Sequence, residues 1–158
     1  MIAPDLSKLA ERFKNEGWHV TIETAGTVAP QGILCDLASI SPKLSDSTPR
    51  EEDAGVGWVA RHAATRLQSA VLKQWAQGYA CQWKFVISDV DCEVSELEAL
   101  IGGIGIPVAR HDVFLMPEGT SSAAIRDRSA ALVELCKERG YRFCDRLHVH
   151  LFGHRRGT

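Results

Sequence analysis

Apolar positions near the start of the chain recur at the spacing of a helix and then at the spacing of a strand. Leu6, Leu9, Ala10 and Phe13 would share one helix face, so the pattern predicts a helix over 5–16 that ends at Gly17. A β-branched run over 19–23 predicts the first strand. The run 33–40 is apolar at almost every position and predicts a second strand, buried on both faces as in a parallel sheet.

The rest of the chain alternates helix and strand. Polar residues over 41–57 predict an exposed loop over a site, and a long helix is expected from Trp58 to Gly78. Its predicted buried stripe is Val59, Ala63, Leu67, Ala70 and Val71. Further strands are predicted over 83–87, 113–116 and 145–151, with Asp91 capping one intervening helix and Ser121 or Ser122 the other.

This order predicts a single α/β domain over residues 1–158, with parallel strands and crossover helices. Such a sheet closes into a barrel or extends as an open, doubly wound sheet, and the pattern leaves both open.

Composition narrows the classes of partner and compartment. With a net charge of −2, the chain offers no electrostatic reason to bind nucleic acid or an anionic membrane. No apolar stretch approaches the roughly 20 residues that cross a bilayer, and no signal peptide is evident. Five cysteines, an odd number at irregular spacing, suit a reducing compartment, so we expect a cytoplasmic protein.

Candidate chemistry gathers where strands are predicted to end. Glu23 precedes a glycine turn, and its carboxylate could accept hydrogen bonds from a ribose or from an amine edge. Ser41 and Lys43 flank Pro42, whose fixed φ would orient both side chains toward one mouth. Lys84 lies in an otherwise apolar strand and needs a partner or a ligand anion. The alternatives are an ordinary strand-end carboxylate, a polar loop and a lysine that reaches the rim.

The last residues hold the densest cluster of ionisable groups. His148 and His150 would share one face of the predicted last strand, as zinc ligands can. Arg146, Arg155 and Arg156 lie close in sequence and disfavour a dication, so no metal site is predicted.

The order and spacing of four motifs resemble 7-carboxy-7-deazaguanine synthase, a radical S-adenosylmethionine (SAM) enzyme of the 7-deazaguanine pathway that leads to queuosine. The motifs are residues 21–27, 39–43, 115–119 and 147–158. The resemblance implies a partial radical SAM-type barrel, of which this chain would form the C-terminal portion. It implies SAM contacts at Glu23, Thr24, Ser41, Pro42, Lys43, Met116 and Pro117. The pterin substrate, 6-carboxy-5,6,7,8-tetrahydropterin, is expected to contact His148, Lys84 and the terminal Thr158.

The chain departs from this family in its cluster motif. Family members carry a Cys x3 Cys x2 Cys loop for a 4Fe-4S cluster and a Gly Gly Glu Pro strand end for SAM, and neither is present here. The complete enzyme also uses Mg2+. We therefore expect Met1 to be an internal methionine, and the isolated chain to be inactive and to need the N-terminal half of the enzyme. The alternatives are a non-catalytic SAM- and pterin-binding subunit of a split enzyme, or a truncated reading frame without function. A homodimer is plausible by resemblance.

Overall fold

The protein is a mixed α/β fold built on one parallel sheet. The computed structural model describes residues 5–155, without the side chains of Asp53 and Val56. Its sheet has five strands in the order β1-β2-β3-β4-β5, and every neighbouring pair is parallel. The strands are β1 (Thr21–Thr24), β2 (Leu37–Ile40), β3 (Cys81–Ile87), β4 (Val113–Pro117) and β5 (Arg142–Phe143).

The helices and 3-10 turns complete the order. They are α1 (Leu6–Asn15), η1 (Ser45–Ser47), α2 (Glu51–Ala54), α3 (Val56–Thr65), α4 (Ser69–Gly78), α5 (Val90–Gly103), η2 (Arg110–Asp112), α6 (Ser122–Arg139) and α7 (Leu147–Phe152).

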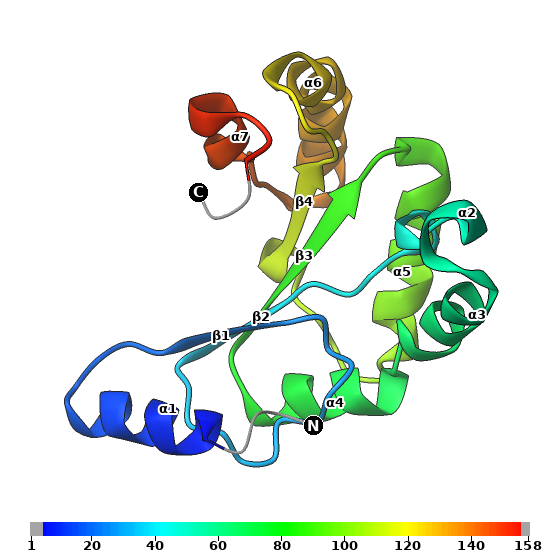
Figure 1. Cartoon of the computed structure of the whole chain (residues 1–158). Helices are drawn as coiled ribbons and strands as arrows, with labels where there is room; N and C mark the ends of the chain where they lie inside the picture. The colour runs from blue at the N-terminus through cyan, green and yellow to red at the C-terminus, as the bar shows by residue number, and fades with distance from the viewer. Residues whose placement is uncertain (1–4, 156–158) are drawn as a thin grey trace.

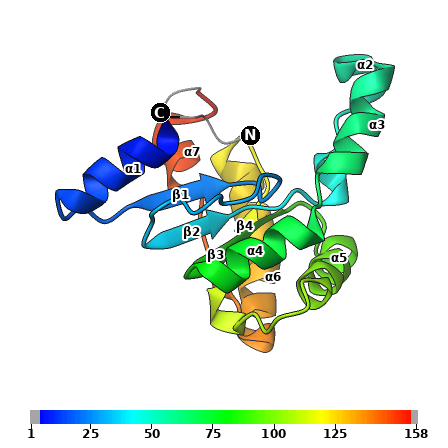
Figure 2. The ribbon, with the colours of Figure 1, turned by 90° about the horizontal axis from the view of Figure 1, so that it is seen from below.

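The strand order resolves the choice between barrel and open sheet. A doubly wound sheet reverses its strand order in the middle, whereas here the spatial order follows the sequence without a reversal. Right-handed crossovers in such an order lie on the same side of the sheet. Figures 1 and 2 show α4, α5 and α6 on that side, α1 beside β1 and α7 near the other end. The sheet is therefore arranged like a segment of a barrel wall.

The side chains of β3 show how the sheet separates its two faces. Trp83, Phe85 and Ile87 are buried against the helices, and the alternating positions Gln82, Lys84 and Val86 are only half-buried. Residues paired across a parallel sheet point to the same face, so the register defines an inner face on all five strands. Its members are Thr21, Glu23, Leu37, Ser39, Gln82, Lys84, Val86, Phe114, Met116 and Arg142.

Local signals at several element ends are confirmed. Gly17 and Gly140 have φ of 82° and 73°, the left-handed values that end helices. The Ser121 side chain accepts a hydrogen bond from the amide of Ala124 and caps α6. Asp89, and not the predicted Asp91, caps α5, since its carboxylate accepts from the amides of residues 91 and 92.

The elements predicted between β2 and β3 are wrong in part. The long helix over 58–78 is two helices, because Arg66 to Gln68 leave the helical path between α3 and α4. Gln68 has φ −123° and ψ 80°, although no glycine or proline lies there. Of the predicted buried stripe, Ala63 and Ala70 are exposed, and Leu72 and Trp75 fill the core in their place. The predicted loop over 41–57 also contains η1 and α2.

The last predicted strand is a helix. On the edge of β4 away from β3, Arg142 and Phe143 are the residues of the described chain that pair as β5. Residues 147–152 form the helix α7. Apolar residues alternate over 147–151, which suggested a strand, but Val149 alone among them is buried, and Leu147 and Leu151 are 63% exposed. His148 and His150 therefore do not share a strand face.

Candidate functional site

A cavity lies at the edge of the sheet where the strands end. It measures about 580 Å³ and is surrounded by residues that follow β2, β3, β4 and β5, together with His62 from α3. Its lining comprises Ser41, Pro42, Lys43, Leu44, Asp46, Ser47, His62, Val86, Ser88, Glu118 and Arg146. Ligand sites of parallel α/β folds form at this edge, and the volume is in the range of small-molecule pockets.

The segment Ser41–Lys43 enters this cavity directly from β2. The Ser41 amide donates to the Thr24 carbonyl at 2.7 Å, which extends the pairing of β1 with β2 by one residue. Pro42 is buried, and the Lys43 side chain is exposed. The Lys43 carbonyl accepts from Arg66 Nη1 at 2.8 Å. The backbone of this predicted site is thus held from both sides, and the hydroxyl and ammonium groups remain available to a ligand.

A second anchor connects the same segment to α5. Glu96 accepts from the amide and the hydroxyl of Ser45 at 3.0 and 2.6 Å, and it pairs with Arg66 at 2.8 Å. Burial by itself would raise the pKa of Glu96, but the hydrogen bonds from Ser45 and Arg66 outweigh it and lower the pKa. Glu96 therefore stays ionised and holds η1 next to the cavity.

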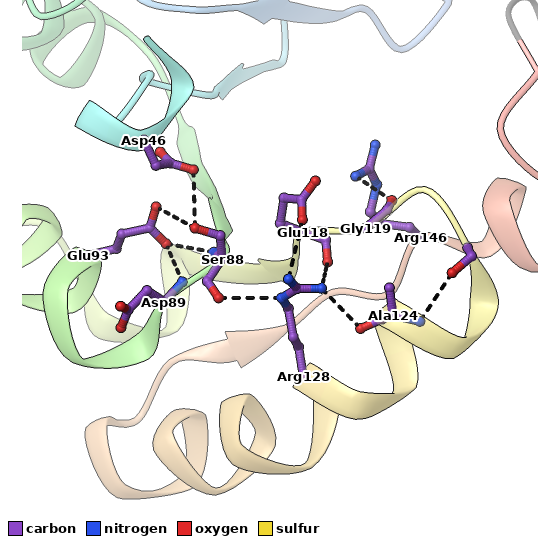
Figure 3. Close-up of polar contacts among 10 residues, drawn as sticks. Asp46, Ser88, Asp89, Glu93, Glu118, Gly119, Ala124, Arg128 and Arg146 are labelled. Atoms are coloured by element: carbon purple, nitrogen blue, oxygen red, sulfur yellow. Dashed lines mark hydrogen bonds and ion pairs between the residues drawn. The ribbon is translucent and has the colours of Figure 1, made fainter. Parts of the chain in front are cut away.

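Glu93 organises the end of β3, as Figure 3 shows. Its Oε2 accepts from the amides of Ser88 and Asp89 at 2.6 and 3.0 Å, although the residue is only 3% exposed. Burial raises the pKa of Glu93 and the nearby Asp46 carboxyl raises it further, which outweighs the lowering effect of the Asp89 and Ser88 amides. The buried carboxyl group of Glu93 thus holds the turn after β3 and contacts the cavity lining at Ser88.

Arginines fasten the ends of β3 and β4 to each other (Figure 3). Arg128 of α6 donates to the carbonyls of Ser88 and Glu118 at 3.3 and 3.2 Å and lies 3.8 Å from the Glu118 carboxylate. Arg146 donates from Nη1 to the Gly119 carbonyl at 3.1 Å, while its Nε is buried without a hydrogen-bond partner among the described residues. These contacts fix the cavity floor in position.

The inner face of the sheet carries polar side chains next to the cavity. Lys84 Nζ lies 2.8 Å from Glu23 Oε1, so the predicted need of this lysine for a partner is met within the chain. The Glu23 side chain is 75% exposed and retains acceptor capacity for a ligand. Gln82 donates to the hydroxyl of the fully buried Ser39 at 2.9 Å. A polar inner face of this kind is suited to polar ligands.

The remaining predicted residues occupy several places. Met116 lies on the inner face opposite Val86, and Pro117 is buried toward the helices. The Thr24 hydroxyl accepts from the Gly26 amide at 3.1 Å and so serves the turn after β1. His148 is an exposed residue of α7 and does not line the cavity. Thr158 lies outside the described residues.

Sequence reasoning missed several cavity residues. Asp46 and Ser88 carried no motif, although Ser88 follows a predicted strand and that position could have suggested it. Glu93, which does not line the cavity but bonds to Ser88, was missed as well. His62 gave no local signal, because its place in the cavity depends on where α3 lies relative to the segment after β2. Arg146 was noted in the polar tail, but as part of a strand.

The cysteines do not suit a metal cluster. Burial raises the pKa of Cys81 and Cys136 to about 11, which disfavours thiolates, and all the cysteines of the described chain are free. Between residues 5 and 155 no group of three or more His, Cys, Asp or Glu side chains is placed to hold a metal ion. We therefore assign no step to a cluster held by this chain. In the same range, no helix is long and apolar enough to cross a membrane.

Comparison with known proteins finds relatives that share one name. No family model matches the chain. The 7-carboxy-7-deazaguanine synthase of Rhodopirellula baltica is 40% identical over 100% of this chain and 60% of its own length. That of Halobacterium salinarum is 39% identical over 96% and 61%, and that of Pyrobaculum aerophilum 30% identical over 87% and 54%.

A solved structure shares the fold. The crystal structure of QueE from Escherichia coli superimposes with a TM-score of 0.56 at 20% identity, covering 87% of this chain and 48% of that one. The chain spans about 60% of the length of the first two curated relatives. It is similar to the C-terminal portion of the relatives that are named 7-carboxy-7-deazaguanine synthase.

Proposed function

We propose that this chain forms the SAM-binding edge and the substrate wall of a 7-carboxy-7-deazaguanine synthase. That enzyme would convert 6-carboxy-5,6,7,8-tetrahydropterin to 7-carboxy-7-deazaguanine. SAM, a 4Fe-4S cluster and Mg2+ would supply the radical chemistry. The cluster would be held by the part of the enzyme outside this chain, so we expect the chain to be inactive by itself. The observation that carries the proposal is the strand-end cavity, since Ser41, Pro42 and Lys43 line it together.

The chain's own residues would bind and orient. Ser41 and Lys43 would contact SAM, and the backbone after β4, at Met116 and Pro117, would lie along its adenine. Glu23 and Lys84 on the inner face would face the pterin, because a carboxylate and an ammonium group match its amine and carboxylate groups. His148 is a weaker candidate for a substrate contact, since its side chain is exposed and lies outside the cavity.

A second surface, next to the edge of β1 that is unpaired in the described chain, supports the proposal that another part of the enzyme binds there. An apolar groove of about 400 Å³ lies between α1 and β1, where Leu9, Phe13 and Trp18 are 48%, 43% and 61% exposed. In the described chain β1 pairs on one side only, with β2. A parallel strand with its helix would pair with this edge and cover the groove. We propose the remaining part of the synthase as that occupant, in the same polypeptide or as a separate subunit.

Reconstitution tests the proposal. The chain is co-expressed with the part of the Rhodopirellula baltica synthase that it does not match. Iron content, SAM affinity and the product, by mass spectrometry, are then measured. We expect a complex that contains iron and forms product. Neither protein should do so alone.

Substitutions connect that activity to the cavity. We expect Lys43→Gln to weaken SAM binding about 10-fold, the effect of one charge-assisted hydrogen bond. Lys8→Gln, on the exposed side of α1, is the control. Unchanged SAM affinity in the Lys43 variant would refute the assignment of the cavity. A complex that assembles but forms no product would refute the proposed reaction.

A further inference from the structure

A second groove lies on the other side of Lys43 and His62 from the strand-end cavity. It measures about 580 Å³ and is formed by the turn after β1, by α3 and by the break between α3 and α4. Its lining consists of Ala25, Thr27, Lys43, Trp58, Arg61, His62, Thr65, Arg66 and Gln68. The volume would admit a small organic molecule.

The lining of this groove is positively charged. Lys43, Arg61 and Arg66 carry three cationic groups, and the lining includes no Asp or Glu. The whole chain has a net charge of −2, so the positive charge of the groove is a local feature that the net charge of the molecule does not share. Cations grouped in a concave site raise the local concentration of anions.

The cations differ in whether the protein already neutralises them. Arg66 is paired with Glu96. Lys43 and Arg61 make no ion pair with any carboxylate whose side chain the structure describes. The Arg61 guanidinium lies 5.9 Å from the centre of the Trp58 ring, which leaves its donors unsatisfied by that contact. Lys43 and Arg61 in the groove are therefore not neutralised by any carboxylate of the described residues.

A neighbouring donor or acceptor is also unsatisfied. His62 Nδ1 is buried, and no hydrogen-bond partner for it exists among the described residues. A buried polar atom without a partner costs about 1–3 kcal/mol, which a ligand or an ordered water can recover. The Trp58 side chain, 52% exposed, adds a flat surface at the rim.

We propose that this groove binds the phosphate or carboxylate group of a small organic anion. Arg61 and Lys43 would contact the oxyanion, and a flat ring carried by the same molecule would stack on Trp58. The groove is separate from the proposed SAM cavity, because Arg61 and Trp58 line only the groove. The two sites share Lys43 and His62, so occupancy of one should influence the other.

Calorimetric titration of the 158-residue chain tests this assignment with inorganic phosphate, AMP and adenosine. We expect phosphate and AMP to bind saturably and adenosine to bind at least about 10-fold more weakly than AMP, or about 1.4 kcal/mol. If AMP binds more tightly than phosphate, the ligand of the groove is a nucleotide-like molecule. Tighter binding of phosphate would assign a free oxyanion.

The variant Arg61→Gln should weaken AMP binding about 10-fold. It should leave SAM binding by the reconstituted enzyme unchanged. Arg126→Gln, an exposed arginine on α6 that does not line the groove, is the matched control, and circular dichroism verifies that both variants fold. Three results would overturn the proposal: no saturable binding of either anion, adenosine equal to AMP, or equal losses in both variants. Loss of SAM binding by Arg61→Gln would overturn it as well, because the groove would then not be separate from the SAM cavity.

Discussion

Replacing Glu93 by alanine removes the acceptor that holds the turn after β3. In the native protein one carboxylate oxygen accepts from the amides of Ser88 and Asp89, at 2.6 and 3.0 Å. Glu93 is only 3% exposed, so its carboxylate is shielded from bulk water, although Asp89 itself is exposed. The variant Glu93→Ala would leave two backbone donors without a partner.

The cost follows from the hydrogen bonds. Each buried donor left unpaired costs about 1–3 kcal/mol. Water can enter from the cavity beside Ser88 and recover part of this, so we expect a net loss of about 2–4 kcal/mol in the free energy of unfolding. Glu93→Gln keeps one side-chain oxygen that can accept from both amides. It should remain within about 1 kcal/mol of the wild type.

The two variants should also separate by pH. Burial and Asp46 raise the pKa of Glu93 above its ordinary value of 4.5, so the folded protein binds this proton more tightly than the unfolded chain does. The resulting stability is fully present below that value and is lost as the pH rises through the folded pKa. The glutamine of Glu93→Gln does not titrate. The free energy of unfolding of this variant should therefore rise relative to that of the wild type as the pH increases from 4.5 to neutrality.

Urea unfolding measures both effects. Trp75 and Trp83 are 1% and 2% exposed and should report loss of the core by fluorescence. Titrations at about pH 5 and 8 give the free energies of the three proteins. The reasoning would be refuted if Glu93→Ala were as stable as the wild type. A constant difference between Glu93→Gln and the wild type at both pH values would refute the titration argument alone.

Three further changes have expected outcomes. Gly26→Ala should destabilise the protein by about 2 kcal/mol or more in urea, because φ is 71° and a Cβ there would lie 2.2 Å from a Leu72 methyl. Gly32→Ala has φ of 74° and open space, so it should cost only about 1 kcal/mol, and equal losses would contradict the steric argument. Glu96→Gln weakens the anchor of η1, so amides over 45–48 should exchange hydrogen at least about 5-fold faster, while α6 stays unchanged. Asp36→Asn should reduce stability near neutral pH but not in acid below the folded pKa of Asp36, because hydrogen bonds from Lys14 and Val20 lower that pKa from its ordinary 3.8. That contribution is lost as the pH falls through the folded value, and an equal effect at both pH values would contradict it.

Features that depend on neighbouring residues could be predicted from the order of the amino acids. β-branched and apolar runs placed β1, β3 and β4, whereas only the last four residues of the predicted strand 33–40 form β2. The caps at Gly17, Ser121 and Gly140 are local chemistry of the backbone. Parallel pairing also followed from the pattern, since crossover helices separate most of the strands. Placing Ser41–Lys43 at a strand end needed no more than this, and the structure puts that segment in the cavity.

Features that depend on distant contacts could not be predicted in this way, because they form only in the folded protein. Arg66 reaches Lys43 and Glu96 where α3 ends, and no local signal marks the break before α4. Residues 147–152 satisfy strand alternation, but β4 has already paired with Arg142 and Phe143, so the segment folds as a helix. Short apolar runs fit both periods, and which one is adopted depends on the hydrogen-bond partners that remain. The cavity, the Glu93 turn and the cationic groove have the same origin, because groups far apart in sequence meet only when the sheet and its helices pack.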